Sequence, residues 1–146
     1  VVALAEGGYQ IPKEDALSKI YGYCVGLDFT RRDMQSGFKE LGRPWDMAKG
    51  FDRSAPMSEI QRADSVGHIS QGAVTLSVNG ETRQSGNVNQ LIWNIPETIA
   101  CLSNLITLCP GDLIMTGTPS GVSAVVADDH LIGCVDNLVD IDIRIG

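Results

Sequence analysis

The sequence lacks the features by which many binding proteins are recognised. It has only two histidines, and none of its four cysteines form a C-x-x-C pair, so it contains no zinc motif and no obvious disulfide framework. Eleven basic side chains against eighteen acidic ones give a net charge of −7, without a Lys/Arg cluster, which excludes nucleic acid as a partner. No apolar run approaches the roughly 18 residues of a membrane helix, so we expect no membrane partner.

The composition instead fits a folded domain with a substantial core. Apolar residues make up 43% of the 146-residue chain and charged residues 20%, a balance typical of globular proteins. Cys24 and Cys101 stand in apolar surroundings, where free cysteine acts as a small core residue. From this cysteine usage we expect a reducing, cytoplasmic location.

The apolar pattern predicts an α+β domain that is mostly β. We expect two short helices, one beginning at Pro12 and one beginning at Pro96. Residues 31–72 are polar and irregular, and a stretch of this length is uncommon in a compact domain unless it is functional. The expected strands are Val1–Ala5, Tyr21–Leu27, Val74–Val78 with a hairpin return through Glu81–Gln84, Leu113–Thr116, Leu131–Val135 and Val139–Ile145.

The first apolar run, Val1–Ala5, has no residues before it. It lacks the basic flank and the length of a signal peptide and has the composition of a buried strand. We therefore interpret residues 1–146 as the C-terminal, larger part of a domain whose upstream segment is absent from this sequence.

A group of charged and polar side chains follows the expected core strand Tyr21–Leu27. Asp28 comes directly after the strand, and Arg32 and Gln35 follow shortly after. A carboxylate anchored at a strand end suits a hard cation, and a guanidinium can bind a substrate carboxylate. The alternative, which the residues alone favour, is an exposed ion-pair cluster of Asp28 and Asp33 with the neighbouring arginines.

Two further loops contain candidate functional residues. Lys49 lies between Ala48 and Gly50 in an aromatic-containing loop, where an ammonium group can stabilise developing negative charge; a solvated loop lysine is the alternative. Residues Thr116–Gly121 follow an apolar strand, and their glycines let backbone N–H groups converge on an anion while a threonine hydroxyl adds a donor. Each loop is a weak signal when taken alone.

Three segments in a fixed order are far more specific than any of them separately. They are Val25–Gln35, Ala48–Asp52 and Pro110–Val122. Together they resemble the fumarylacetoacetate hydrolase family over essentially the whole chain. Within that family, Gly42–Met57 and Leu91–Trp93 are most similar to fumarylpyruvate hydrolases.

The resemblance implies a fold, a cofactor and roles for particular residues. It implies mixed β-sheets that form a rolled, barrel-like core, a homodimer, and a site for Mg²⁺ or Mn²⁺. The cation would act as a Lewis acid on a small 2-oxo acid substrate. By the resemblance, Asp28 is a metal ligand, Lys49 is the catalytic residue that polarises substrate oxygens, Arg32 and Gln35 face the substrate, and Thr118 contacts its carboxylate or the oxyanion.

The resemblance also implies residues that this sequence does not contain. In the family, a Glu-x-Glu pair on the strand that runs into Val1 supplies further metal ligands, and a histidine, often with a glutamate, activates water. A single aspartate cannot hold Mg²⁺ in a catalytic position. From a polypeptide that begins at Val1 we therefore expect negligible turnover and weak metal affinity.

The sequence thus predicts a metal-dependent hydrolase that cleaves a carbon–carbon bond of an acylpyruvate such as fumarylpyruvate, in aromatic catabolism. The alternatives within the family are an oxaloacetate decarboxylase and an isomerase or decarboxylase of a hydroxy-diene dicarboxylate. A non-catalytic binding domain on the same scaffold is a further alternative. A Glu-x-Glu pair directly before Val1 would favour the enzyme over the binding domain.

Overall fold

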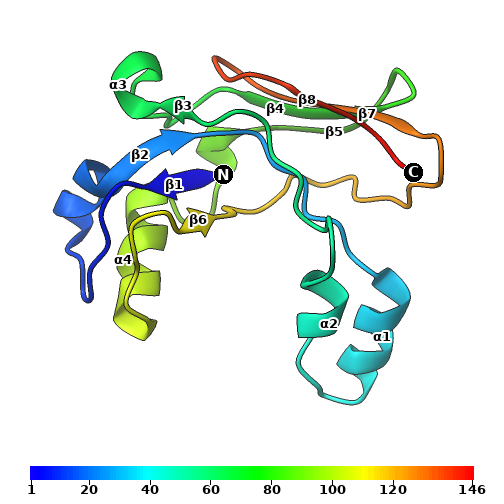
Figure 1. Ribbon diagram of the computed structural model, residues 1–146, viewed down its shortest axis with the longest axis horizontal. Helices are drawn as coiled ribbons and strands as arrows, with labels where there is room; N and C mark the ends of the chain where they lie inside the picture. The colour runs from blue at the N-terminus through cyan, green and yellow to red at the C-terminus, as the bar shows by residue number, and fades with distance from the viewer.

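The computed structural model describes residues 1–146 as two four-stranded sheets with helices packed at one end and a helical hairpin below them (Figure 1). All strand pairings in both sheets are antiparallel. The first sheet contains β1 (Val2–Leu4), β2 (Ile20–Tyr23), β3 (Gln61–Arg62) and β6 (Leu113–Ile114), and the second contains β4 (Ala73–Val78), β5 (Glu81–Asn87), β7 (His130–Val135) and β8 (Ile141–Arg144).

Six helical segments connect and cover these strands. None of them has both the length and the apolar character that a membrane span requires. They are the 3-10 helices η1 (Lys13–Lys19) and η2 (Val88–Gln90) and the α-helices α1 (Arg32–Glu40), α2 (Asp46–Lys49), α3 (Ala63–Val66) and α4 (Ile95–Leu105).

The mostly β class expected from the sequence is confirmed, with two differences. The sheets are antiparallel throughout, in the orders β3-β2-β1-β6 and β5-β4-β7-β8, where mixed sheets were expected. The number of helices is also larger than the expected two, because the region 31–72 contains α1, α2 and α3. These three helices bury only one side chain, Ala48, and two of them, α2 and α3, have only four residues, so the sequence gives little sign of a core helix here.

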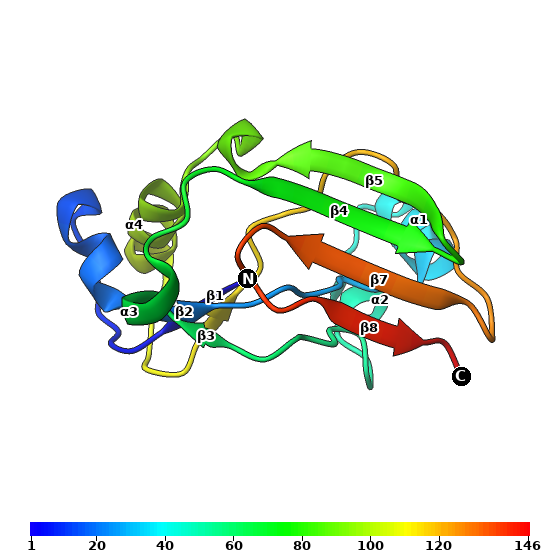
Figure 2. The same ribbon diagram turned by 90° about the horizontal axis from the view of Figure 1, so that it is seen from above.

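The hairpin of β4 and β5 forms where the sequence predicts it. Asn79 and Gly80 adopt φ angles of 52° and 82°, the two positive values that a type I′ turn needs. The strand order of the second sheet places β4 between β5 and β7, and Figure 2 shows these ribbons side by side. The inner face of this sheet includes Val78 and Leu131, which pair across β4 and β7 and are both buried.

The main apolar core lies between the first sheet, η1 and α4. Ile99 of α4 is fully buried there, together with Val2 and Ile20 of the sheet. Ser103 of the same helix is also fully buried, and its hydroxyl accepts a hydrogen bond of 2.9 Å from the Ile11 backbone N–H. Asn94 caps the helix in a reciprocal capping box with Glu97. The core thus fixes the end of the molecule opposite the helical hairpin (Figure 1).

Helices α1 and α2 form the hairpin below the sheets (Figure 1). Helix α1 buries no residue, and its apolar side chains Met34 and Phe38 are one turn apart on one face. The Arg31 guanidinium lies 4.4 Å from the centre of the Phe51 ring, a cation–π contact that joins the two ends of the hairpin. The hairpin is therefore held by local contacts rather than by the core.

The position of Ile99 gives a stability prediction for the core. Ile99→Ala should lower the free energy of unfolding by about 2–5 kcal/mol, because it removes apolar atoms from a closed site and leaves a cavity. Leu105→Ala on the same helix, at a side chain that is 74% exposed, should change it by less than about 0.5 kcal/mol. Denaturant unfolding of both variants measures the difference; equal effects would contradict the core as described.

Candidate active site

Backbone pairing brings Asp28 and Lys49 together. After β2 the chain continues in extended form and pairs with the end of α2 and the segment that follows it. Phe29 N–H donates to the Ser54 carbonyl oxygen at 2.8 Å, and Arg31 N–H donates to the Ala48 carbonyl oxygen at 3.0 Å. Asp28 lies on the segment after β2, and Lys49 is the last residue of α2, next to Ala48, so their separation is set by main-chain hydrogen bonds and not by the flexible side chains alone.

The Lys49 ammonium group binds both Asp28 and Thr30. Its Nζ lies 2.7 Å from Asp28 Oδ2 and 2.8 Å from Thr30 Oγ1. The partner of Asp28 is thus Lys49, and the exposed cluster of Asp28 with the neighbouring arginines, which was the alternative from sequence, does not form. Both side chains remain partly open to solvent, with exposed fractions of 45% for Asp28 and 37% for Lys49.

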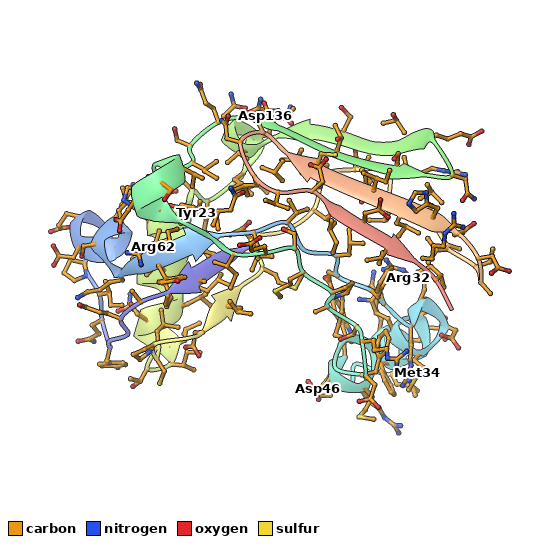
Figure 3. All side chains as sticks on the ribbon, turned by 45° about the horizontal axis from the view of Figure 1, so that its top comes forward. Tyr23, Arg32, Met34, Asp46, Arg62 and Asp136 are labelled. Atoms are coloured by element: carbon orange, nitrogen blue, oxygen red, sulfur yellow. The ribbon has the colours of Figure 1, made fainter.

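Asp28, Arg32 and Thr118 line one cavity of about 570 Å³. It lies between the inner face of the second sheet, the extended segment after β2 and the loop after β6. Arg32 stands at the end of α1 nearest the sheets (Figure 3). The lining therefore contains an acidic, a basic and a hydroxyl group, of the kinds that orient a small polar ligand.

Two of the predicted residues stand beside this cavity rather than in its lining. Lys49 reaches it through its contacts with Asp28 and Thr30. Gln35 Oε1 accepts a hydrogen bond of 2.5 Å from Arg32 Nη1, so Gln35 positions the guanidinium in this structure. The five residues selected from sequence are thus gathered in one region, and their roles stay predictions.

The loop Thr116–Gly121 is pressed against β5. A Cβ atom on Gly121, which has a φ of +100°, would lie 2.1 Å from the Arg83 carbonyl oxygen, so only glycine fits there. Gln84 of β5 is buried, and its Nε2 donates to Thr118 Oγ1 at 2.8 Å and to the Pro119 carbonyl oxygen at 2.7 Å. These contacts fix the loop along the wall of the cavity.

Gln84 and Thr30 are site residues that the sequence reasoning missed. Thr30 lies within the Asp28–Gln35 cluster, and its place two residues from Asp28 was the available signal. Gln84 could not have been found by strand alternation, because β5 carries an irregularity at this point. Ser77 pairs with Thr82, but Leu76 pairs with Gln84, so Arg83 is the extra residue of a β-bulge.

A second cavity of about 190 Å³ shares Gly117, Thr118 and Pro119 with the first one and is mainly apolar. Tyr23 lines it, and burial raises the pKa of this phenol to about 12, so Tyr23 stays protonated at neutral pH. Its hydroxyl is 2.8 Å from His68 Nδ1. This titratable group therefore belongs to the packing between the sheet and α3 and not to the Asp28 cluster.

The predicted dication site is incomplete within these residues. Mg²⁺ takes about six oxygen ligands in near-octahedral geometry, and Mn²⁺ prefers the same ligand type. Asp28 offers one exposed carboxylate at the cavity, but nowhere in the chain do three His, Cys, Asp or Glu side chains come together. Asp28 thus fits as one ligand of such an ion, and these residues do not form the whole site.

Comparisons with known proteins agree with the resemblance in sequence. The family described as fumarylacetoacetate (FAA) hydrolase C-terminal matches residues 1–143. A fumarylpyruvate hydrolase from Ralstonia sp is 47% identical over 146 residues, and the mitochondrial oxaloacetate tautomerase FAHD1 of Rattus norvegicus is 38% identical over 144 residues. The crystal structure of fumarylpyruvate hydrolase from Pseudomonas aeruginosa, in complex with Mn²⁺ and pyruvate, superposes with a TM-score of 0.97 at 46% identity.

The chain belongs to the fumarylacetoacetate hydrolase family. The match covers all of this chain and 76% of the Ralstonia protein, 99% of this chain and 65% of the rat protein, and 99% of this chain and 62% of the crystallised Pseudomonas chain. The relatives thus contain a portion that this chain does not match, between about a quarter and two fifths of their length. The family and the fold expected from the sequence are both confirmed.

The exposure of the Asp28–Lys49 pair gives a prediction that separates a chemical role from a structural one. Lys49→Met should lower the free energy of unfolding by less than about 1 kcal/mol, because partly exposed ion pairs contribute little to stability. Lys13→Met, which removes the comparable surface pair of Lys13 with Glu97, is the matched control. Thermal unfolding of both variants measures this, and a loss well above the control would assign Lys49 a structural role.

Proposed function

We propose that the protein carrying this chain is an enzyme that hydrolyses a carbon–carbon bond of an acylpyruvate, with fumarylpyruvate as the substrate. The observation that supports this most is the Lys49 ammonium held 2.7 Å from Asp28 at the edge of a cavity that Arg32 and Thr118 also line. The similarity to the Ralstonia and Pseudomonas fumarylpyruvate hydrolases over the whole chain supports the choice of substrate.

The proposed reaction assigns each of these side chains a task. An acylpyruvate has two carbonyl groups separated by one carbon. Water adds to the outer carbonyl, the bond to the central carbon breaks, and its electron pair remains on the pyruvate part as an enolate that then takes up a proton. Lys49 stabilises the negative charge of the enolate, and Arg32 pairs with a substrate carboxylate. The Thr118 hydroxyl donates a hydrogen bond to an anionic oxygen of the substrate.

The proposal includes a divalent cation, Mg²⁺ or Mn²⁺, with Asp28 as one of its ligands. The exposed position of the Asp28 carboxylate at the cavity supports this, as does the Mn²⁺ present in the Pseudomonas structure. Lys49 and the cation would then share the Asp28 carboxylate, so the charge of Asp28 is balanced on two sides.

Two substitutions test the site in the protein that carries this sequence. Asp28→Ala should weaken Mn²⁺ binding, followed by electron paramagnetic resonance, by at least about tenfold to a hundredfold, since it removes a carboxylate ligand. Lys49→Met should lower kcat for fumarylpyruvate by about 10²–10³-fold, because the negative charge that forms during bond breaking loses the ammonium group that stabilises it. Loss of fumarylpyruvate absorbance measures the rate.

Asp33→Ala is the matched control for both measurements. Asp33 lies on α1, five positions after Asp28, is exposed, and forms no ion pair. It should leave Mn²⁺ affinity and kcat within about twofold of the parent. If Asp28→Ala behaves like Asp33→Ala in both measurements, Asp28 has no part in the mechanism.

Oxaloacetate chemistry is the second candidate function. The 38% identity to the rat oxaloacetate tautomerase over nearly the whole chain favours it. Oxaloacetate also carries a 2-oxo acid group, so the same Arg32, Lys49 and Thr118 would contact it. Comparison of kcat/KM for fumarylpyruvate and oxaloacetate on one preparation decides between the two; a higher value for oxaloacetate would replace the hydrolase assignment.

The proposal also includes a homodimer in the cytoplasm that acts in aromatic catabolism. The side chains of Ile92 and Trp93 are 96% and 54% exposed beside the cap of α4, and a partner that covered them would remove apolar surface from water. All four cysteines are free, as a reducing compartment requires.

The homodimer gives a prediction of mass in solution. Sedimentation equilibrium of the parent protein should give twice the mass of one polypeptide, and the measured mass should fall toward that of one polypeptide in Ile92→Glu. A mass of one polypeptide in the parent contradicts the dimer.

A further inference from the structure

Gln84 is a buried polar side chain with both of its donor hydrogens engaged on one loop. Only 8% of the residue is exposed. Its Nε2 lies 2.8 Å from Thr118 Oγ1 and 2.7 Å from the Pro119 carbonyl oxygen, and the residue lines the same cavity as Asp28 and Thr118. The amide thus links β5 to the part of the loop that the proposed function uses.

The Pro119 contact determines the direction of the Thr118 contact. A backbone carbonyl oxygen can only accept a hydrogen bond, so the amide group of Gln84 must present its nitrogen, not its oxygen, to the loop. The same nitrogen then donates to Thr118 Oγ1. A hydroxyl group has one proton and two lone pairs. Because Thr118 accepts from Gln84, its own proton is left for another acceptor in the cavity.

We propose that Gln84 is a positioning residue: it orients the Thr118 hydroxyl so that this group donates a hydrogen bond to an anionic oxygen of the bound 2-oxo acid. The inference rests on the proposed function, since it takes the ligand to be a 2-oxo acid. A neutral amide suits this task, because it donates twice and adds no charge beside the anion. A carboxylate in its place would accept the Thr118 proton and repel the ligand.

The bulge in β5 is what makes this arrangement possible. Without the extra residue, a two-residue hairpin would pair Leu76 with Arg83, and a guanidinium would face the inner side of the sheet. The bulge instead leaves Arg83 exposed and places Gln84 opposite Leu76, on the face that lines the cavity. The backbone geometry thus determines which residue of β5 faces the cavity, and the residue at that position is a glutamine.

The test compares variants at Gln84 and Thr118 in the protein that carries this sequence, with pyruvate and Mn²⁺ as the binding probe. Gln84→Leu should raise the dissociation constant of pyruvate about tenfold, the effect of losing one oriented hydrogen bond to a charged group. Gln84→Glu, which keeps the size of the side chain, should raise it further. In turnover of fumarylpyruvate, both should change the same parameter, KM or kcat, that Thr118→Val changes.

A double-mutant cycle distinguishes positioning from a general structural effect. If Gln84 acts through the Thr118 hydroxyl, the variant with Gln84→Leu and Thr118→Val together should bind pyruvate no more weakly than Thr118→Val alone. Additive losses would overturn the inference, because they would show that Gln84 contributes independently of that hydroxyl. Melting temperatures accompany each measurement, and the uncharged Gln84→Met, which has a similar length, replaces Gln84→Leu in the cycle if the latter does not fold.

Ser85→Ala is the matched control, since Ser85 is the next residue of β5 and is exposed on the opposite face. It should leave pyruvate affinity unchanged. If the parent protein binds pyruvate and Gln84→Glu binds it equally well, the inference about Gln84 fails while the proposed function stands. If the parent protein neither binds pyruvate nor hydrolyses an acylpyruvate, the proposed function fails, and the inference fails with it.

Discussion

The candidate site depends on the antiparallel backbone contact between the segment after β2 and the segment formed by the end of α2 and the residues after it. Hydrogen bonds from the N–H groups of Leu27, Phe29 and Arg31 to carbonyl oxygens of Pro56, Ser54 and Ala48 align the two segments. The contact places an acidic residue of one segment against a basic residue of the other. Main-chain groups have few alternative partners in this extended geometry, so the alignment of the two charges follows from the strand pairing.

In the proposed function, the Asp28–Lys49 pair has little value for folding and a large value for chemistry. Partly exposed pairs gain little in stability, because water already solvates both charges well. The same partial exposure leaves the Asp28 carboxylate and the Lys49 ammonium accessible from the cavity side. A charge kept close to an opening by rigid backbone is available to a ligand without a large reorganisation.

Much of the fold could be predicted from local patterns, and the parts that could not have identifiable reasons. The Asn79-Gly80 turn and the stripe of α4 around Ile99 are local signals, and both formed as expected. Helix α1 was missed because its apolar face is short, with Met34 and Phe38 one turn apart, and is surrounded by charged residues and glycines that resemble a loop. The bulge at Arg83 was missed because no turn or alternation signal marks it; the Arg83 carbonyl oxygen packs against Gly121, a contact between residues far apart in the chain.

The site is assembled from two parts of the molecule that are held by different forces. Arg32 and Lys49 lie on the helical hairpin, which local contacts maintain, whereas Gln84 and Thr118 lie on the sheet and its adjoining loop. A ligand that touches both parts acts as a bridge between them. Its binding energy then also opposes any separation of the hairpin from the sheet. Filling the cavity should therefore restrict the motion of the hairpin, and a change that loosens the hairpin should weaken ligand binding.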